Sequence, residues 1–213
     1  MKKYVNLFVF VFMVGACFSQ GKAQTKSAVS YKNPVVDIAM PDPTVIKAAD
    51  GYFYVYATES TRNVPIMKSK DLVQWTYCNT AFTNKTRPRF EPKAGIWAPD
   101  INYINNKYVL YYAMSVWGGE QTCGIGVATA NSPQGPFTDH GKMFRSNEIG
   151  VQNSIDPSFL QYEGRNYLVW GSFRGIYVIE LTEDGLSLKP GAEKKRIAGT
   201  AFEAAYIHKH GDY

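Results

Sequence analysis

The sequence contains few cysteines and no apolar run long enough to cross a membrane. The N-terminal apolar run, Leu7 to Phe18, has 12 residues, whereas a membrane-spanning helix needs about 20. Only three cysteines are present, and their spacing is not that of a zinc site. These shortages exclude a membrane-spanning helix and a cysteine-based zinc module. Stability must therefore come mainly from a hydrophobic core, for which the chain is long enough.

The first 23 residues have the pattern of a secretory signal peptide. Two lysines follow the first methionine, the apolar run comes next, and small residues precede a cleavage site after Ala23. We therefore expect a signal peptide over residues 1–23 and a secreted or periplasmic bacterial protein. The alternative is a lipoprotein, because the VGAC segment that ends at Cys17 resembles a lipoprotein box. Lipidation of Cys17 is the only route to a membrane that the sequence offers.

A large excess of basic residues is also missing once the signal peptide is removed. Its removal takes away three lysines and no acidic residue, so the formal net charge falls from +5 to +2. No Lys/Arg block of the length of a nucleic-acid-binding patch remains, and we expect no nucleic-acid partner. The mature chain keeps Cys78 and Cys123. The sequence leaves open whether they form a disulfide or remain two buried thiols.

Aromatic residues, in contrast, are abundant, at 15% of the chain, and 15 of them are tyrosines. Aromatic rings favour strands because they fit a pleated surface. The same flat rings are useful where sugars are held, since the apolar face of a sugar ring stacks on them. Composition alone does not separate these two uses.

Four segments of the chain share one layout. Each opens with an acidic residue and a short apolar stretch, continues through a polar turn with Gly or Asn, and ends in an aromatic-rich alternating run. This layout predicts two strands joined by a tight hairpin. The segments are DPTVIKAADGYFYVYATES, PDINYINNKYVLYYAMS, DPSFLQYEGRNYLVWGSF and the shorter EAAYIHKHGDY.

Each of the first three hairpins is followed by a second pair of strand-like pieces. The segments SKDLVQW, NSPQGPF and TEDGLSL occupy equivalent turns within these pairs. Four short strands per repeat of about 45 to 60 residues, without helical periodicity, are typical of β-propeller blades. A β-sandwich is the alternative for many short strands, but it does not explain why acidic residues recur at regular intervals.

We therefore expect an all-β fold, an incomplete propeller with about three and a half blades in residues 24–213. The expected blades are at about 33–80, 95–145 and 150–195, with the start of a fourth at 200–213. Because an open propeller exposes unpaired strand edges, we expect this chain to be the N-terminal part of a longer protein.

The acidic residues that open the repeats are Asp42, Asp100, Asp156 and Glu203, separated by 58, 56 and 47 residues. The innermost strands of a propeller all run the same way, so we expect these carboxylates to converge on one pocket. Close carboxylates raise one another's pKa, and an acid–base pair of carboxylates is what glycoside hydrolysis requires. Individually, an Asp before Pro is a common turn residue. Asp100 is open between a structural role and substrate contact.

The motifs PDPTVI, GIWAPDINYINNKYVLYYAMS, NSIDPSFL, WGSFRGIY and FEAAYIHKHGDY, in this order, resemble glycoside hydrolase family 43. The resemblance covers about residues 33–213 and matches the N-terminal portion of the family's catalytic domain. It implies a five-bladed propeller that hydrolyses arabinose- or xylose-containing plant polysaccharides with inversion. It implies no cofactor for the chemistry, no metal ligand in this chain, and a structural calcium only from later blades.

The resemblance also implies roles for three residues. Asp42 would be the general base that activates water, Glu203 the general acid, and Asp156 the residue that orients the acid and tunes its pKa. An inverting mechanism requires the base and acid to lie roughly 6.5 to 9.5 Å apart. One departure is Ala205, where the family often has Pro.

Five further residues are expected to contact substrate. Trp97, Trp117 and Phe173 would stack on sugar rings, although Trp97 is equally open to packing between blades. The other two expected contacts are Asp100 and Ser172. Trp170, in contrast, is expected to pack between blades.

The motifs are most similar to the arabinan-cleaving branch, the endo-1,5-α-L-arabinosidases, or to α-L-arabinofuranosidases. Arg174 stands where that branch often has an aromatic residue, which leaves endo or exo cleavage open. The alternatives are a β-xylosidase or arabinoxylan-active enzyme, a fructan-cleaving relative, and a non-catalytic glycan-binding propeller. The presence of all three acids argues against the last. The expected partner is an oligo- or polysaccharide, and the protein is expected to be a monomer.

Overall fold

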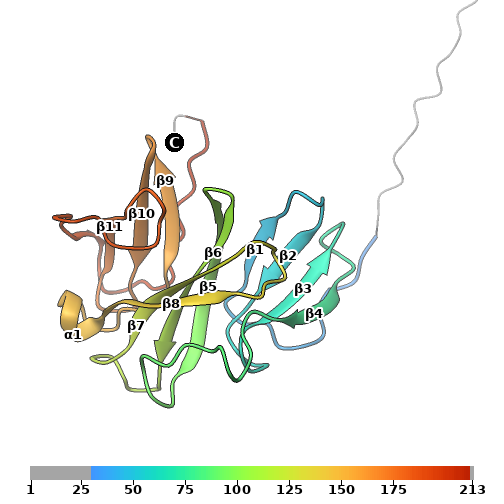
Figure 1. Ribbon diagram of the computed structural model, residues 1–213, viewed down its shortest axis with the longest axis horizontal. Coiled ribbons are helices and arrows are strands. Elements are labelled where there is room, and N and C mark those ends of the chain that lie inside the picture. Colours follow the sequence, from blue (N-terminus) through green and yellow to red (C-terminus); the bar gives the residue numbers. More distant parts are fainter. Residues whose placement is uncertain (1–29, 212–213) are drawn as a thin grey trace, which may run out of the picture. The chain divides into compact units, whose positions relative to one another are not determined.

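The computed structural model describes residues 30–211 (Figure 1). The residues from Lys32 onwards form one compact unit. The expected signal peptide over residues 1–23 and the expected lipidation of Cys17 lie outside the described residues and stay predictions. In the described part of the chain, no helix is both long and apolar enough to cross a membrane.

The first sheet has four antiparallel strands in the order β1-β2-β3-β4. Gly51 closes the β1–β2 hairpin with a φ of 82°, in the left-handed region that glycine adopts without strain. The strands are β1 Thr44–Lys47, β2 Phe53–Tyr56, β3 Pro65–Ser69 and β4 Thr76–Thr80.

The second sheet has the order β5-β6-β7-β8, again antiparallel. Asn105 and Asn106 join β5 to β6, and both have positive φ values. That pair is the two-residue hairpin turn whose twist matches the flanking strands. The strands are β5 Gly95–Ile104, β6 Lys107–Ser115, β7 Gly124–Ala130 and β8 Thr138–Arg145, and a single helical turn, α1 Ser146–Ile149, follows.

The third sheet has the same plan, with neighbours in the order β9-β10-β11-β12. Glu163 and Gly164, both with positive φ, form its first hairpin turn. The strands are β9 Ser158–Tyr162, β10 Arg165–Trp170, β11 Ile176–Glu180 and β12 Lys195–Ala198.

The turns between the third and fourth strands of each sheet are built alike. They contain the three segments that the sequence placed in equivalent turns. In each turn, a polar side chain accepts a hydrogen bond from the backbone two residues later: Asp71 from Val73, Ser132 from Gln134 and Asp184 from Leu186. Such local side-chain bonds favour a turn over a continued strand. The repeat is thus visible in the turn chemistry as well as in the strand order.

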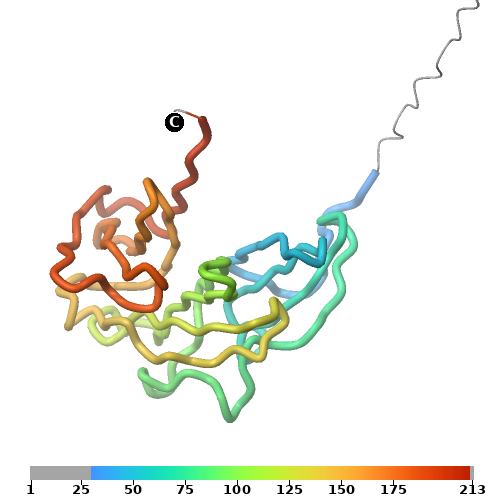
Figure 2. Tube along the Cα trace, turned by 45° about the horizontal axis from the view of Figure 1, so that its top comes forward, coloured from blue at the N-terminus to red at the C-terminus, as the bar shows by residue number. Residues whose placement is uncertain are grey.

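The second sheet lies between the first and the third in both views (Figures 1 and 2). Its strand β6 is buried on both faces, as its alternating side chains show. Leu110 and Tyr112 belong to the core shared with the first sheet, whereas Val109 and Tyr111 belong to the core shared with the third. Packing of successive sheets face to face is what a propeller requires of its blades.

Trp170, at the end of β10, packs between the second and third sheets, as the sequence predicted. Its side chain is fully buried. Its ring lies 5.1 Å from the ring of Phe144 on β8 and stacks 5.8 Å from that of Tyr177 on β11, measured between centroids. Aromatic pairs at such separations add to the stabilisation that burial alone gives.

The predicted propeller class is confirmed, and the sandwich alternative is not, because three separate four-stranded sheets succeed one another. Residues 200–211 contain no strand; Glu203 instead forms an isolated antiparallel bridge with Ser172, which follows β10 of the third sheet. Cys78 and Cys123 are free thiols. The disulfide is therefore not formed, and of the two thiols Cys123 is buried and Cys78 only half-buried.

Replacement of Trp170 by Ala should destabilise the fold severely. The cavity left between two blades is expected to lower the free energy of unfolding by about 3–5 kcal/mol. Urea denaturation of the full-length gene product measures this loss. Trp117→Ala is the matched control, because its side chain is 93% exposed and its loss should change stability by less than about 0.5 kcal/mol. Equal stabilities of the two variants would contradict the packing role.

Candidate active site

A cleft of about 1020 Å³ opens where the inner strands of the three sheets begin. Residues just before and within β1, β5 and β9 form its walls, together with the loops that follow β2, β6 and β10. All eight residues that the sequence nominated line it. They are Asp42, Trp97, Asp100, Trp117, Asp156, Ser172, Phe173 and Glu203.

A left-handed step recurs at the inner strands: it precedes β1 and β9, and in β5 it lies at the register shift between Trp97 and Asp100. Asp42, Ala98 and Asp156 have φ values of 50°, 39° and 57°, and each precedes a proline. Ala204 has a φ of 51° and precedes Ala205, where the family often has Pro. These four residues therefore occupy one equivalent position in the successive repeats. A non-glycine residue adopts this conformation only where the surrounding structure imposes it.

This register corrects the expectation that four acids share one position. Asp42 and Asp156 do share it, but Ala98 holds it in the second repeat and Ala204 in the fourth. Asp100 therefore lies two residues deeper in its strand, and Glu203 lies one residue earlier. The residue-Pro steps, rather than the acids, are the sequence signal that aligns the repeats.

Asp42 is an exposed residue whose carboxylate is oriented by Thr58. The Thr58 hydroxyl donates to Asp42 Oδ2 at 2.6 Å and accepts from the Ala98 amide at 2.7 Å. The second carboxylate oxygen forms no hydrogen bond within the described chain. Thr58 was missed from the sequence, because its position opposite the Asp-Pro step is set by strand pairing and not by any local motif.

Asp156 is half-buried, and its pKa is raised to about 7. Burial is the main cause, followed by the negative charges of Glu203 and Asp42, while a backbone hydrogen bond from Ala204 opposes the rise. Burial and neighbouring like charges both favour the neutral acid. The three carboxylates that the sequence nominated as catalytic therefore form one electrostatically coupled cluster.

Glu203 is exposed and is attached to the third sheet. The Ser172 hydroxyl donates to Glu203 Oε2 at 3.0 Å, and the Phe173 amide donates to the Phe202 carbonyl at 2.9 Å. The Ser172 carbonyl in turn accepts from the Asn153 side chain at 3.0 Å. Ser172, expected to contact substrate, thus holds the carboxylate of Glu203.

Aromatic rings form the part of the wall contributed by the second sheet. The rings of Trp97 and Trp117 lie 5.5 Å apart at an angle of 51°. Trp117 is almost fully exposed, and Phe173 across the cleft is also exposed. Trp97 packs in addition against the small core cluster around Ile155. Trp97 therefore combines the two roles that the sequence left open, packing between blades and lining the cleft.

The rim of the cleft carries a paired arginine. Arg174 Nε and Nη2 donate to the two carboxylate oxygens of Glu120 at 3.1 and 3.0 Å, a bidentate contact. Gln152 donates to the same carboxylate at 2.6 Å. The arginine that replaces the usual aromatic residue thus fixes the loop after β6 to the loop after β10. Glu120 has no motif that would have identified it.

Asp100 is buried and joins the three inner strands. Its carboxylate accepts from the Phe159 amide on β9 at 2.7 Å, from Asn102 Nδ2 on β5 at 2.8 Å and from the Thr44 hydroxyl on β1 at 3.3 Å. Burial raises its pKa to about 6, and these hydrogen bonds oppose the rise. Because protein donors occupy the carboxylate, the geometry favours the structural role over the substrate contact.

The two histidines of the fourth segment, His208 and His210, are exposed. Within residues 30–211, no three His, Cys, Asp or Glu side chains are grouped closely enough to hold a metal ion. The expected calcium from later blades stays a prediction.

The family model for glycosyl hydrolases family 43 matches residues 31–213. The chain belongs to glycosyl hydrolase family 43. This confirms the family that the ordered motifs indicated, and the match extends over the three sheets and the Glu203 segment. The carboxylate cluster therefore lies in a fold of known glycosidases.

Curated relatives of this family 43 chain carry names of arabinan-cleaving enzymes. The chain is 31% identical over 180 residues to the probable arabinan endo-1,5-alpha-L-arabinosidase C of Aspergillus niger. It is 34% identical over 186 residues to the extracellular endo-alpha-(1->5)-L-arabinanase 1 of Bacillus subtilis. Each match covers 81% of this chain and 56% of the relative. The chain thus spans about half the length of the curated relatives it matches.

Solved structures of arabinanases share the fold. An exo-1,5-alpha-L-arabinanase from a bovine ruminal metagenomic library matches with a TM-score of 0.70 and 29% identity, over 85% of this chain and 65% of that one. The Cellvibrio cellulosa alpha-L-arabinanase complexed with arabinohexaose matches with a TM-score of 0.70 and 26% identity, over 82% and 62%. The likeness extends to one exo-acting enzyme and to one that binds an arabinose hexamer.

Replacement of Asp100 by Asn should loosen the contact between the inner strands. The Asn side chain has one acceptor oxygen where the carboxylate has two. At pH 8 the free energy of unfolding should therefore fall by about 1–3 kcal/mol. Urea denaturation of the full-length gene product measures this. Thr44→Val removes the longest of the three bonds and the 3.3 Å bond that the Thr44 hydroxyl accepts from the Ile101 amide, but it leaves both bonds to Asp100 Oδ2 in place and should cost less. If Asp100→Asn is as stable as the wild type, Asp100 does not join the strands.

Asp156 should make stability depend on pH. The folded protein holds its proton where the unfolded chain has released it, so the stabilisation is complete below about pH 4 and is lost as the pH rises through about 7. Asp156→Asn stays neutral throughout. Its melting temperature should therefore fall less than that of the wild type between pH 4 and 7.

The control for this comparison is Asp37→Asn, an exposed aspartate outside the three sheets. Its melting temperature should follow the wild-type curve across the same pH range. Parallel curves for the wild type and Asp156→Asn would show that burial and the neighbouring charges do not favour the protonated form of Asp156.

Proposed function

We propose that the protein is an inverting glycosidase that cleaves the 1,5-linked arabinose chain of arabinan. The observation that carries this proposal is the cluster of three carboxylates, in three different environments, on one cleft. Asp42 is exposed and oriented by Thr58, Asp156 is half-buried with a raised pKa, and Glu203 is exposed and held by Ser172. Different environments are what separate the roles of paired acids and bases.

In the proposed reaction, Asp42 is the general base. Its free carboxylate oxygen takes a proton from water as the water oxygen attacks the anomeric carbon. The bond from that carbon to the glycosidic oxygen breaks, and the leaving oxygen takes the proton of Glu203. The hydroxyl group enters on the face opposite the leaving group, so the configuration is inverted. The next turnover requires that the proton passes back from Asp42 to Glu203 through solvent.

Asp156 is the proposed tuner of the general acid. Its pKa is sensitive to the charge of Glu203, and electrostatic coupling between two groups is reciprocal. This coupling between the two carboxylates is the observation on which the proposed role of Asp156 rests. Ser172 positions the Glu203 carboxylate, and removal of the hydroxyl should misplace the proton donor without removing it.

Arabinan is the proposed substrate because the relatives are named for it and the cleft offers flat rings. Trp117 presents an almost fully exposed indole beside Trp97, a surface suited to the apolar face of a pentose. The Glu120–Arg174 pair joins the loop after β6 to the loop after β10 at the edge of the cleft, where a bound chain would pass. Whether the enzyme cuts inside the chain or from its end depends on these loops.

Secretion is the proposed location. The first 23 residues have the pattern of a signal peptide, and a Bacillus subtilis relative is named as extracellular. Arabinan is too large to enter a cell intact, so an extracellular or surface-anchored site suits the proposed activity.

Substitution of either proposed catalytic residue should abolish most of the activity. Asp42→Asn and Glu203→Gln should each lower kcat/KM on debranched arabinan by at least about 10²-fold. The assay is sugar release by the full-length gene product, with arabinoxylan and xylo-oligosaccharides as parallel substrates. Asp37→Asn is the control and should be fully active.

Two results would contradict the proposal. Wild-type turnover by either variant would remove that residue from the chemistry. Nuclear magnetic resonance of the first-formed product reports its anomeric configuration, and retention instead of inversion would exclude direct attack on the anomeric carbon by a water that Asp42 activates. Preference for the xylose-based substrates would move the proposed specificity to β-xylosides.

A further inference from the structure

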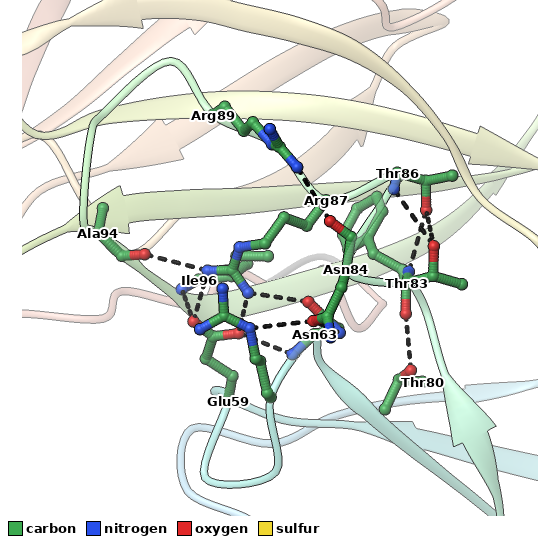
Figure 3. Close-up of polar contacts among 12 residues, drawn as sticks. Glu59, Asn63, Thr80, Thr83, Asn84, Thr86, Arg87, Arg89, Ala94 and Ile96 are labelled. Atoms are coloured by element: carbon green, nitrogen blue, oxygen red, sulfur yellow. Dashed lines mark hydrogen bonds and ion pairs between the residues drawn. The ribbon is translucent and has the colours of Figure 1, made fainter.

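A second hollow, separate from the cleft, lies between the β2–β3 loop and the β4–β5 loop. Its volume is about 350 Å³, and it shares no lining residue with the cleft. Four of its ten lining residues are cationic: Arg62, Arg87, Arg89 and Lys93. They come from the β2–β3 and β4–β5 loops, which Figure 3 shows in contact.

Arg87 forms the floor of the hollow and is already neutralised. Its two terminal nitrogens each lie 2.8 Å from a carboxylate oxygen of Glu59, and they also donate to Asn63 Oδ1 at 2.9 Å and to the Ala94 carbonyl at 3.0 Å (Figure 3). The guanidinium is buried. A bidentate buried pair with further hydrogen bonds is a rigid element. Arg87 therefore builds the site and is not free for a ligand.

The acidic residues around the hollow are also occupied. Glu59 accepts hydrogen bonds from the Asn63 and Ile96 amides at 2.7 and 3.0 Å in addition to Arg87. Glu91 Oε1 accepts from the Thr122 hydroxyl at 3.1 Å, whereas the buried Oε2 lies 2.7 Å from Arg145 Nη1 in an ion pair but accepts no hydrogen bond within the described residues. Neither carboxylate forms an ion pair with the other three cations of the hollow.

Two exposed arginines converge on one neutral residue. Arg62 Nε donates to Asn84 Oδ1 at 3.1 Å, and Arg89 Nη2 donates to the Asn84 carbonyl at 3.0 Å. Arg62, Arg89 and Lys93 form no ion pair within residues 30–211. Like charges held together by an uncharged residue repel one another unless an anion lies between them. This arrangement is that of an anion-binding site without its anion.

The size and lining of the hollow indicate the kind of anion. A volume of about 350 Å³ is at the lower end for small-molecule pockets, about 300–1,000 Å³, and is larger than a bare oxyanion needs. Pro88 and Pro92 contribute apolar surface beside the cations. Guanidinium groups bind carboxylates through paired, parallel hydrogen bonds. One sugar ring that bears a carboxylate matches all three features.

We propose that this hollow binds a uronate, a carboxylate-bearing sugar residue of the polysaccharide that the enzyme acts on. The carboxylate would lie between Arg62 and Arg89, and the ring would lie against the prolines. Met114 of β6 lines the hollow, and the next residue, Ser115, lines the cleft. A uronate held here would therefore keep an acidic part of the polysaccharide close to the cleft. The proposed binding of a uronate does not depend on which bond the enzyme cuts. Its role in holding the polysaccharide rests on the proposed function.

Titration of the full-length gene product with galacturonate and with its dimer, followed by nuclear magnetic resonance or calorimetry, tests the proposal. Both should bind, and neutral galactose should not. The double variant Arg62→Gln/Arg89→Gln should weaken binding by at least about tenfold, which corresponds to the loss of about 1.4 kcal/mol. Arg165→Gln, an exposed arginine on the third sheet, is the matched control and should bind like the wild type.

Three results would overturn the proposal: no binding of either uronate, equal binding by the double variant, or binding of inorganic sulfate without binding of galacturonate. Equal melting temperatures of the wild type and the double variant would show that weakened binding is not caused by unfolding. The Asp42→Asn variant should bind galacturonate like the wild type. Failure of the uronate site is therefore distinguishable from failure of the proposed hydrolysis.

Discussion

A buried carboxylate cannot be left without hydrogen-bond donors, and this requirement at Asp100 sets the geometry of the cleft. The donors of Asp100 come from three inner strands, so those strands must lie at fixed distances from one another. Thr44 is two residues from Asp42, and Phe159 is three residues from Asp156. The positions of two proposed catalytic carboxylates are thus coupled through a third carboxylate, to which the proposed reaction gives no chemical step. A neutral amide of the same shape has one acceptor oxygen instead of two, so it would keep its bond to one of these strands and weaken its contact with the other.

The left-handed steps at Asp42 and Asp156 depend on the hydrogen bonds of Asp100. A φ near +50° costs a non-glycine residue about 1 kcal/mol or more. The step turns each carboxylate out of its strand and into the cleft, while the prolines that follow begin the inner strands. Strain of this kind persists only where neighbouring contacts over-determine the conformation. The bonds of Asp100 and of Thr58 are such contacts, and they lie within a few residues of the strained positions.

The sequence predicts the fold and the members of the site better than their arrangement. Strand-turn layouts and residue-Pro steps recur often enough to predict the blades, and all eight nominated residues line one cleft. The depth of Asp100 was not predictable, because an acid has no signature of its register along a strand. Thr58 and Glu120 were missed for a related reason. Their partners lie 16 and 54 residues away, and only strand pairing and loop contacts bring them together.

The cleft and the second hollow carry charges of opposite sign. The cleft collects three coupled carboxylates, and their charges would repel any acidic sugar that entered it. The uncompensated arginines lie outside the cleft, at Arg62 and Arg89, on loops that are stiffened by the Glu59–Arg87 pair. Glu59 adjoins Thr58, which orients Asp42, so the rigid floor of the hollow and the proposed base belong to one stretch of backbone. A polysaccharide with neutral and acidic parts can therefore occupy both sites in one arrangement. Its acidic part lies in the hollow, and its neutral chain lies over the carboxylates of the cleft.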